Sequence, residues 1–108
     1  MMNKKFPIWR DAESLVVAIE KAVRGFARYH KYTLGQELRL ESYALLETIT
    51  HAINQQEARE QWLTKAHLHS ETLKIKIHCS KSLNLYANFQ QFEAIAQFAY
   101  VVSKQAKA

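Results

Sequence analysis

The sequence predicts an all-α protein: an antiparallel up-down-up-down four-helix bundle that forms a single domain over residues 1–108. The chain has only two glycines and one proline, whereas a sheet protein of this size needs many turns. Apolar residues also recur at steps of three and four, as they do on one face of a helix. We therefore expect four helices, over residues 11–29, 34–54, 58–81 and 89–103.

The first two helices follow from their apolar stripes and from one capping signal. In the first helix the stripe consists of Leu15, Ile19, Ala22 and Phe26. Thr33 precedes the second helix and, with Gln36 three residues later, fits a capping box. The second stripe then consists of Leu34, Leu38, Leu45, Ile49 and Ala52.

The third and fourth helices are separated by a break at the stretch "SLNLYAN", residues 82–88. The stripe of the third helix contains small as well as large residues, namely Leu63, Ala66, Ser70, Leu73, Ile77 and Ser80. Asn88 is expected to cap the fourth helix, because its side chain can accept a hydrogen bond from a free amide of the first turn. Residues 103–108 are polar and are expected to form a frayed tail.

Positive charge gathers on two of these helices. The net charge is +5 and the sequence pI is about 9.4, which favours nucleic acid or an acidic protein surface as partner. Contact with the RNA or DNA backbone would use the cations of the first and third helices, without strong sequence preference: Lys21, Arg24, Arg28, Lys31, Lys65, Lys74, Lys76 and Lys81. The alternative is a solvated, charged helix face with no ligand.

A second set of apolar residues lies off the main stripes. It consists of Leu68, Ile75, Phe89, Phe98 and Val101. These residues favour a surface that is buried in a homo-oligomer, because a small bundle cannot bury opposite faces of the same helix. A broad core stripe is the other interpretation.

The sequence contains no motif that favours catalysis, so we expect no catalytic residue, no cofactor and no metal. His67, Glu71 and His78 share a helix face, but no two histidines stand four residues apart as a metal site on one helix requires. The single cysteine, Cys79, is expected to face the core or an interface, and it favours the reducing cytoplasm. No apolar run approaches the roughly 18 residues that span a bilayer, and the first residues lack the apolar segment of a signal peptide.

The stretch "FARYHKYTLGQELR" (residues 26–39), followed by "LLETITHAI" (residues 45–53), resembles a known family. It is similar to the accessory variability determinant (Avd) of diversity-generating retroelements, within the broader four-helix-bundle family that includes proteins encoded by intervening sequences of 23S ribosomal RNA genes. The resemblance implies a basic homopentamer without catalytic activity, which binds the reverse transcriptase and its template RNA. Relatives often have proline where this chain has Ala27, so the first helix is expected to run longer here.

Three interpretations of the function remain open at this point. The first is an accessory nucleic-acid-binding protein of a retroelement, and the second is a helical interaction or oligomerisation module with incidental basicity. The third, a metal-dependent enzyme, depends on the histidines alone.

Gly35, in the family stretch, permits close approach to the backbone. We expect a neighbouring helix there, and a phosphate held with Arg28 and Lys31 is the alternative. Tyr29 and Tyr32 can pack against the protein or stack on bases.

Overall fold

Helices account for all the regular structure of the part of the chain that the computed structural model describes, residues 6–107, which contains no strand. Two of the connections contain a single short helix of their own, α2 and the 3-10 helix η2. In chain order the elements are α1 (Pro7–Arg24), α2 (Arg28–Lys31), α3 (Leu34–Asn54), η2 (Gln56–Ala58), α4 (Arg59–Ser82) and α5 (Phe89–Lys107).

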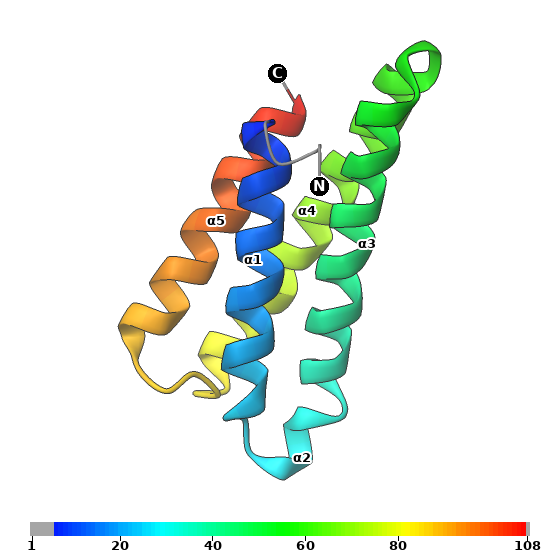
Figure 1. The fold of residues 1–108 in the computed structure, drawn as a ribbon. Coiled ribbons are helices and arrows are strands. Elements are labelled where there is room, and N and C mark those ends of the chain that lie inside the picture. The colour runs from blue at the N-terminus through cyan, green and yellow to red at the C-terminus, as the bar shows by residue number, and fades with distance from the viewer. Residues whose placement is uncertain (1–5, 108) are drawn as a thin grey trace.

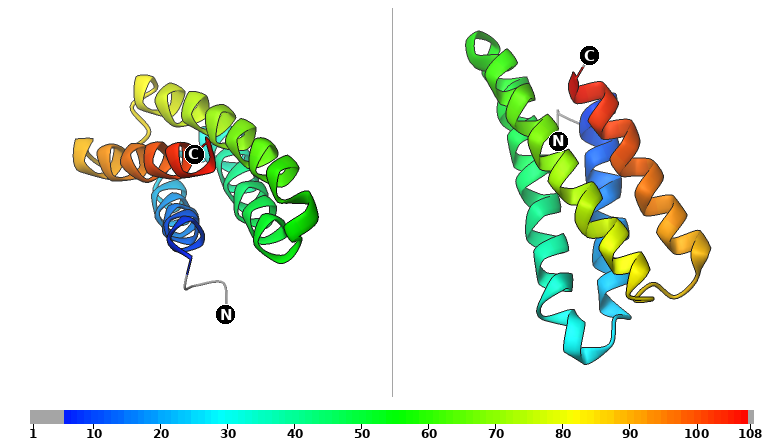
Figure 2. Two further views of the ribbon diagram at one scale, coloured as in Figure 1. Left: turned by 90° about the horizontal axis from the view of Figure 1, so that it is seen from above. Right: turned by 180° about the vertical axis from the view of Figure 1, so that it is seen from behind.

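The four long helices form a bundle that measures 43 × 21 × 21 Å. Helix α1 packs against α3 and α5, and α4 packs against the same two helices, so the four surround one core (Figures 1 and 2). The start of α1, the end of α5 and the connection between α3 and α4 lie toward one end, whereas α2 lies at the other (Figure 1).

The core is built from the predicted stripes, with small residues where α4 meets its neighbours. On α4 the buried residues are Ala66, Ser70, Leu73, Ile77 and Ser80. The hydroxyl groups of Ser70 and Ser80 donate to the carbonyl oxygens of His67 and Lys76 in the same helix, at 2.6 and 2.9 Å. Because these hydroxyls are satisfied locally, small polar side chains can occupy the core and let the helices approach closely.

Helix α1 differs from its predicted range of residues 11–29. It begins at Pro7, whose ring suits a first helical position. It ends at Arg24, and Ala27 is extended with φ −55° and ψ 145°. Phe26 is buried although it lies in this connection, so the apolar step from Ala22 to Phe26 continued the helical pattern past the end of the helix. The expectation of a longer helix at Ala27 was wrong.

The other helices begin close to their predicted residues. The range of α3 is confirmed, α4 runs one residue later at each end, and α5 continues to Lys107, so the expected frayed tail is helical as far as the described residues reach. Asn88 Oδ1 accepts from the amide of Gln91 at 2.8 Å, which confirms that cap.

The capping box predicted at Thr33 is wrong. Its side chain makes no capping hydrogen bond and instead donates to the carbonyl oxygen of Tyr29 at 3.1 Å. Gln36 Oε1 accepts from Arg39 rather than from the backbone before the helix. The hydroxyl of Thr33 therefore closes α2 instead of opening α3.

Two side-chain hydrogen bonds tie α1 to its neighbours near the termini. Trp9 Nε1 donates to Thr50 Oγ1 of α3 at 2.9 Å, and Gln105 Nε2 of α5 donates to Asp11 Oδ2 at 2.9 Å. The start of α1 thus lies beside the ends of both neighbouring helices. None of the helices within residues 6–107 is long and apolar enough to cross a membrane.

Candidate nucleic-acid interface

The end of α1 and the short helix α2 together carry four cations at one end of the bundle. Lys21 and Arg24 lie in the last turn of α1, and Arg28 and Lys31 are the first and last residues of α2. We call these four residues the basic end. All four were assigned to the first helix from the sequence, and this is wrong for Arg28 and Lys31 because α1 ends at Arg24.

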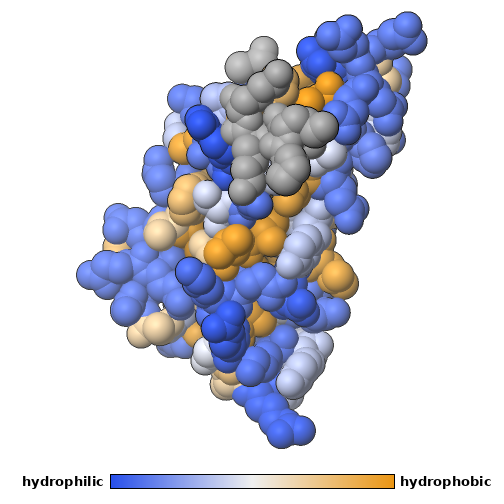
Figure 3. Space-filling model, in the orientation of Figure 1, coloured by the Kyte–Doolittle hydropathy of each residue, from blue (hydrophilic) through white to orange (hydrophobic). Residues whose placement is uncertain are grey.

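The basic end is open to solvent. Lys21, Arg24 and Arg28 are exposed and Lys31 is half-buried. Within residues 6–107 none of the four forms an ion pair with a carboxylate. Figure 3 shows that the part of the surface around α2 is largely hydrophilic. Unpaired, exposed cations of this kind can approach phosphates without first breaking an internal contact.

A hollow of about 220 Å³ opens where α1, α2 and α3 meet. It receives one cation from each of these helices, namely Arg24, Lys31 and Arg39, and it is completed by Glu20, Val23, Tyr32 and Gln36. Three cations against one carboxylate leave an excess of positive charge around the hollow, so its chemistry suits an anion.

Arg39 and Glu20 form an ion pair on one side of this hollow. Arg39 Nε donates to Glu20 Oε1 at 2.8 Å, and the hydroxyl of Tyr43 donates to Oε2 at 2.8 Å. The hydrogen bond from Arg39 is the main reason why the pKa of Glu20 lies below its ordinary value, and the pKa of Arg39 is raised by the same contact. Glu20 is therefore ionised at neutral pH, with both oxygens already hydrogen-bonded.

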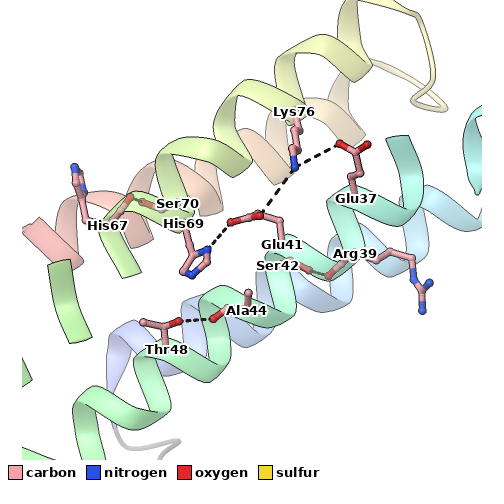
Figure 4. A network of polar contacts seen from close by, with 10 residues as sticks. All are labelled: Glu37, Arg39, Glu41, Ser42, Ala44, Thr48, His67, His69, Ser70 and Lys76. Atoms are coloured by element: carbon pink, nitrogen blue, oxygen red, sulfur yellow. Dashed lines mark hydrogen bonds and ion pairs between the residues drawn. The ribbon is translucent and has the colours of Figure 1, made fainter. Parts of the chain in front are cut away.

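Arg39 is a residue that the sequence did not single out for the site. Its partner Glu20 stands 19 positions away on another helix, so their contact depends on how α1 and α3 are aligned, which the periodicity of each helix does not reveal. The acidic neighbours of Arg39 in the sequence, Glu37 and Glu41, point toward α4, whereas Arg39 points away from it (Figure 4).

Lys76 of α4 is engaged in a polar network with α3 (Figure 4). Its Nζ lies 3.4 Å from Glu37 Oε1 and 4.0 Å from Glu41 Oε1. His69 Nδ1 lies 2.6 Å from the other oxygen of Glu41. This network joins two helices, so the positive charge of Lys76 is balanced inside the protein.

The remaining predicted cations of α4 also have partners. Lys74 Nζ lies 2.7 Å from Glu71 Oε2, which also accepts from the hydroxyl of Ser103 on α5 at 2.7 Å. Lys65 Nζ stands 4.7 Å from the centre of the Trp62 ring and Lys81 Nζ 5.4 Å from that of Phe92. The α4 cations thus point to different neighbours, and their use as a nucleic-acid surface stays a prediction.

The apolar residues predicted at an oligomer interface fall into two groups. Leu68, Ile75 and Phe89 are exposed, with 62, 66 and 56% of their surface accessible. Phe98 and Val101 are partly buried, and Phe98 packs against the core. In the single chain, Phe98 therefore belongs to a broad core stripe, which was the alternative interpretation of this set.

Two hollows lie where α4 and α5 pack together on this apolar side. The larger, of about 750 Å³, is lined mainly by side chains of these two helices: Glu71, Lys74, Ile75, His78, Phe89, Phe92, Glu93, Ala96, Gln97 and Tyr100. The smaller, of about 330 Å³, includes Leu63, Leu68 and Ala106. The sequence did not identify Tyr100, an exposed aromatic residue that lies four positions after Ala96.

The histidines of α4 and Cys79 have individual environments. His67 Nε2 stands 3.9 Å from Glu71 Oε2, whereas the ring of His78 packs edge-on against Phe92 with centroids 5.2 Å apart. Residues 6–107 contain no group of three side chains placed to hold one metal ion. Cys79 is exposed, so it does not face the core of the single chain, and the alternative that it faces an interface stays a prediction.

Comparison of this chain with protein-family models and with curated proteins gave no match in either case.

Proposed function

We propose that this protein binds the sugar–phosphate backbone of RNA or DNA through its basic end, and acts as a non-catalytic accessory protein of a diversity-generating retroelement. The observation that carries the binding is the group formed by Lys21, Arg24, Arg28 and Lys31, none of which forms an ion pair with a carboxylate within the described residues. Each phosphate that such a cation neutralises releases counterions, which favours association.

The retroelement role rests on the resemblance of residues 26–39 to the Avd family. In that role the protein binds the reverse transcriptase of the element as well as its template RNA, and supports mutagenic synthesis of complementary DNA in the cytoplasm. A reverse-transcriptase gene with a template repeat beside the gene of this protein would support the assignment. A gene neighbourhood without either would leave nucleic-acid binding as the whole of the proposal.

The proposal includes an antiparallel up-down-up-down arrangement of the four helices and their assembly into a homopentamer. The arrangement is supported by contacts between the start of one helix and the end of the next, such as Trp9 with Thr50 and His67 with Ser103. Assembly is supported by the exposed apolar residues Leu68, Ile75 and Phe89. Five subunits would present five copies of the basic end to one nucleic acid, which raises the overall affinity.

A salt titration tests the nucleic-acid binding. The affinity for a labelled single-stranded RNA is measured between low and moderate salt for the protein and for the double variant Arg24→Glu/Arg28→Glu. We expect the affinity to fall steeply with salt, and the variant to bind at least ten-fold more weakly while its circular dichroism stays helical. An affinity that is independent of salt would contradict phosphate contacts.

A matched control separates the basic end from net charge. Arg10→Glu/Lys104→Glu removes the same charge from two exposed residues, one near the start of α1 and the other near the end of α5. This control should retain most of the affinity. Equal losses in the two double variants would mean that overall charge, and not the basic end, determines binding.

The second candidate is a helical protein-interaction or oligomerisation module, and the exposed apolar surface of α4 and α5 favours it. Such a module predicts assembly through Leu68 and Ile75 without appreciable affinity for RNA. The same titration discriminates between the two, because a protein module with incidental basicity would show no saturable binding to RNA even at low salt.

A further inference from the structure

Tyr32 stands beside the hollow at the junction of α1, α2 and α3 with its ring open to solvent. It follows Lys31 at the end of α2, and 71% of its surface is accessible. It lines the same hollow as Arg24, Lys31 and Arg39. An exposed aromatic ring that adjoins three cations gains little from packing in the folded chain, so it is free to contact a ligand.

The hollow is too small for a nucleotide base together with its sugar and phosphate. Its volume of about 220 Å³ is below the roughly 300–1,000 Å³ that encloses small organic ligands. A single phosphate group fits its size and its charge, and two guanidinium groups and one ammonium group then surround the phosphate oxygens. The rest of the nucleotide must lie outside, on the side where Tyr32 is exposed.

Resting on the proposed nucleic-acid binding, we propose that this junction selects single strands: one backbone phosphate occupies the hollow and the adjoining unpaired base stacks on Tyr32. Stacking is open to every base, because each has a π-face, and it adds affinity without sequence preference. In a duplex the faces of the bases are covered by their neighbours in the helix, so a duplex can supply the phosphate but not the stacked base.

Val23 and Glu20 define the limits of this site. Val23 is buried and lines the hollow with its apolar side chain. Glu20 carries a negative charge, but both of its oxygens accept hydrogen bonds from Arg39 and Tyr43. The carboxylate thereby holds Arg39 at the edge of the hollow, and its charge also acts on Arg24. Three cations against this one carboxylate still leave an excess of positive charge for the phosphate.

Substitution of Tyr32 tests the proposal with two probes: a labelled oligothymidylate of about 12 nucleotides, which has no secondary structure, and a duplex of the same length. We expect Tyr32→Leu to weaken binding of the single strand roughly ten-fold or more, in line with the loss of one stacked base. Its affinity for the duplex should change less than two-fold, and Tyr32→Phe should bind both probes like the parent protein.

Tyr29→Leu is the matched control, because Tyr29 on α2 is also open to solvent, with 81% of its surface accessible, but does not line the hollow. It should leave both affinities unchanged. Tyr32 is exposed, so the fold should tolerate its substitution, and circular dichroism checks this.

The Tyr32 variant tests this inference, and the Arg24→Glu/Arg28→Glu variant tests the proposed function, so the two can fail separately. If Tyr32→Leu binds the single strand as tightly as the parent, or loses both probes equally, single-strand selection at Tyr32 is overturned. If the affinity of Arg24→Glu/Arg28→Glu is still reduced in that case, the proposed function stands. If the parent protein binds neither probe at low salt, both proposals fall together.

Discussion

The backbone of Gly35 in α3 lies so close to Val23 of α1 that a Cβ added to this glycine would stand 2.8 Å from Val23 Cγ1. The same Cβ would stand 3.1 Å from the carbonyl oxygen of His30, the residue that precedes Lys31 in α2. Gly35 is buried. A neighbouring helix therefore occupies the space that glycine leaves open, as expected from the sequence, and the phosphate alternative is not needed to explain this residue.

Gly35→Ala should destabilise the protein. The added methyl group would collide with Val23 and with a backbone oxygen that cannot easily move, and overpacking of this kind costs about 1–3 kcal/mol. The gain in helix propensity on replacing glycine is at most about 1 kcal/mol. We expect a net loss that lowers Tm by several degrees in thermal unfolding followed by circular dichroism.

Gly25→Ala provides the control for that measurement. The nearest atom to a Cβ at Gly25 is the carbonyl oxygen of Ala22 at 3.6 Å, an ordinary contact, and its φ of −93° suits any residue. Tm should stay unchanged or rise slightly in this variant. If both alanine variants unfold at the parent temperature, close packing at Gly35 does not limit stability.

The bundle itself could be predicted from the sequence because each helix buries one continuous stripe. The stripe of α4 from Ala66 to Ser80 is buried at the expected positions. The end of α1 could not be predicted in this way, because Phe26 is buried from a loop while it keeps helical spacing. A hydrophobic pattern reports burial, and burial does not require the residue to be helical.

The site was predictable only where one segment of chain contains it. Arg24 and Lys31 were identified from charge along the sequence, and both reach the hollow. The contribution of Arg39 could not be found, since it depends on the alignment of two helices. Lys76 shows the same dependence on a second helix, because its partners Glu37 and Glu41 lie on α3. A lysine that has no acidic partner on its own helix is thus paired by carboxylates of the neighbouring helix.

Neutralising cations of the basic end and of α4 should have different effects. Lys21→Gln/Lys31→Gln removes two charges that have no carboxylate partner within residues 6–107, whereas Lys74→Gln/Lys76→Gln removes two that are paired with Glu71, Glu37 and Glu41. For single-strand binding, the logarithm of the binding constant falls linearly with the logarithm of the salt concentration. We expect the first double variant to make this slope less steep by roughly 1.4, which corresponds to the loss of two phosphate contacts.

The second double variant should instead affect the fold. Loss of the ion pairs of Lys74 and Lys76 should lower Tm by a small amount, because partly exposed pairs each stabilise by about 0–1 kcal/mol. Its salt slope should match that of the parent. A decrease in salt slope that is as large in the α4 variant as in the Lys21/Lys31 variant would instead assign phosphate contacts to α4.

Acid should weaken the contacts between helices that depend on Glu20 and Glu71. The pKa of Glu20 is lowered chiefly by the hydrogen bond from Arg39, and that of Glu71 chiefly by the one from Lys74. For a carboxyl whose folded pKa is depressed, the stabilisation is complete above its unfolded pKa, about 4.3 for Glu, and is lost as pH falls through the folded pKa.

Urea unfolding at neutral pH and at about pH 3 measures this effect. The parent protein should lose more free energy of unfolding between the two pH values than Glu20→Gln/Glu71→Gln, because the variant has no carboxylate to protonate at these positions. A loss of equal size in both proteins would show that other carboxyl groups determine acid stability. Glu47→Gln, at an exposed position of α3, serves as a control for general acid effects.

The apolar surface of α4 should control assembly. Leu68→Glu/Ile75→Glu places charge at two exposed positions one heptad apart, where burial against a second subunit would require removing both carboxylates from water. We expect the parent to elute as an oligomer in size-exclusion chromatography with light scattering, and the variant as a helical monomer. Leu40→Glu, at a similarly exposed residue of α3, is the control and should remain assembled. A parent that is monomeric at high concentration would contradict assembly, and a variant that remains oligomeric would place the interface on another face.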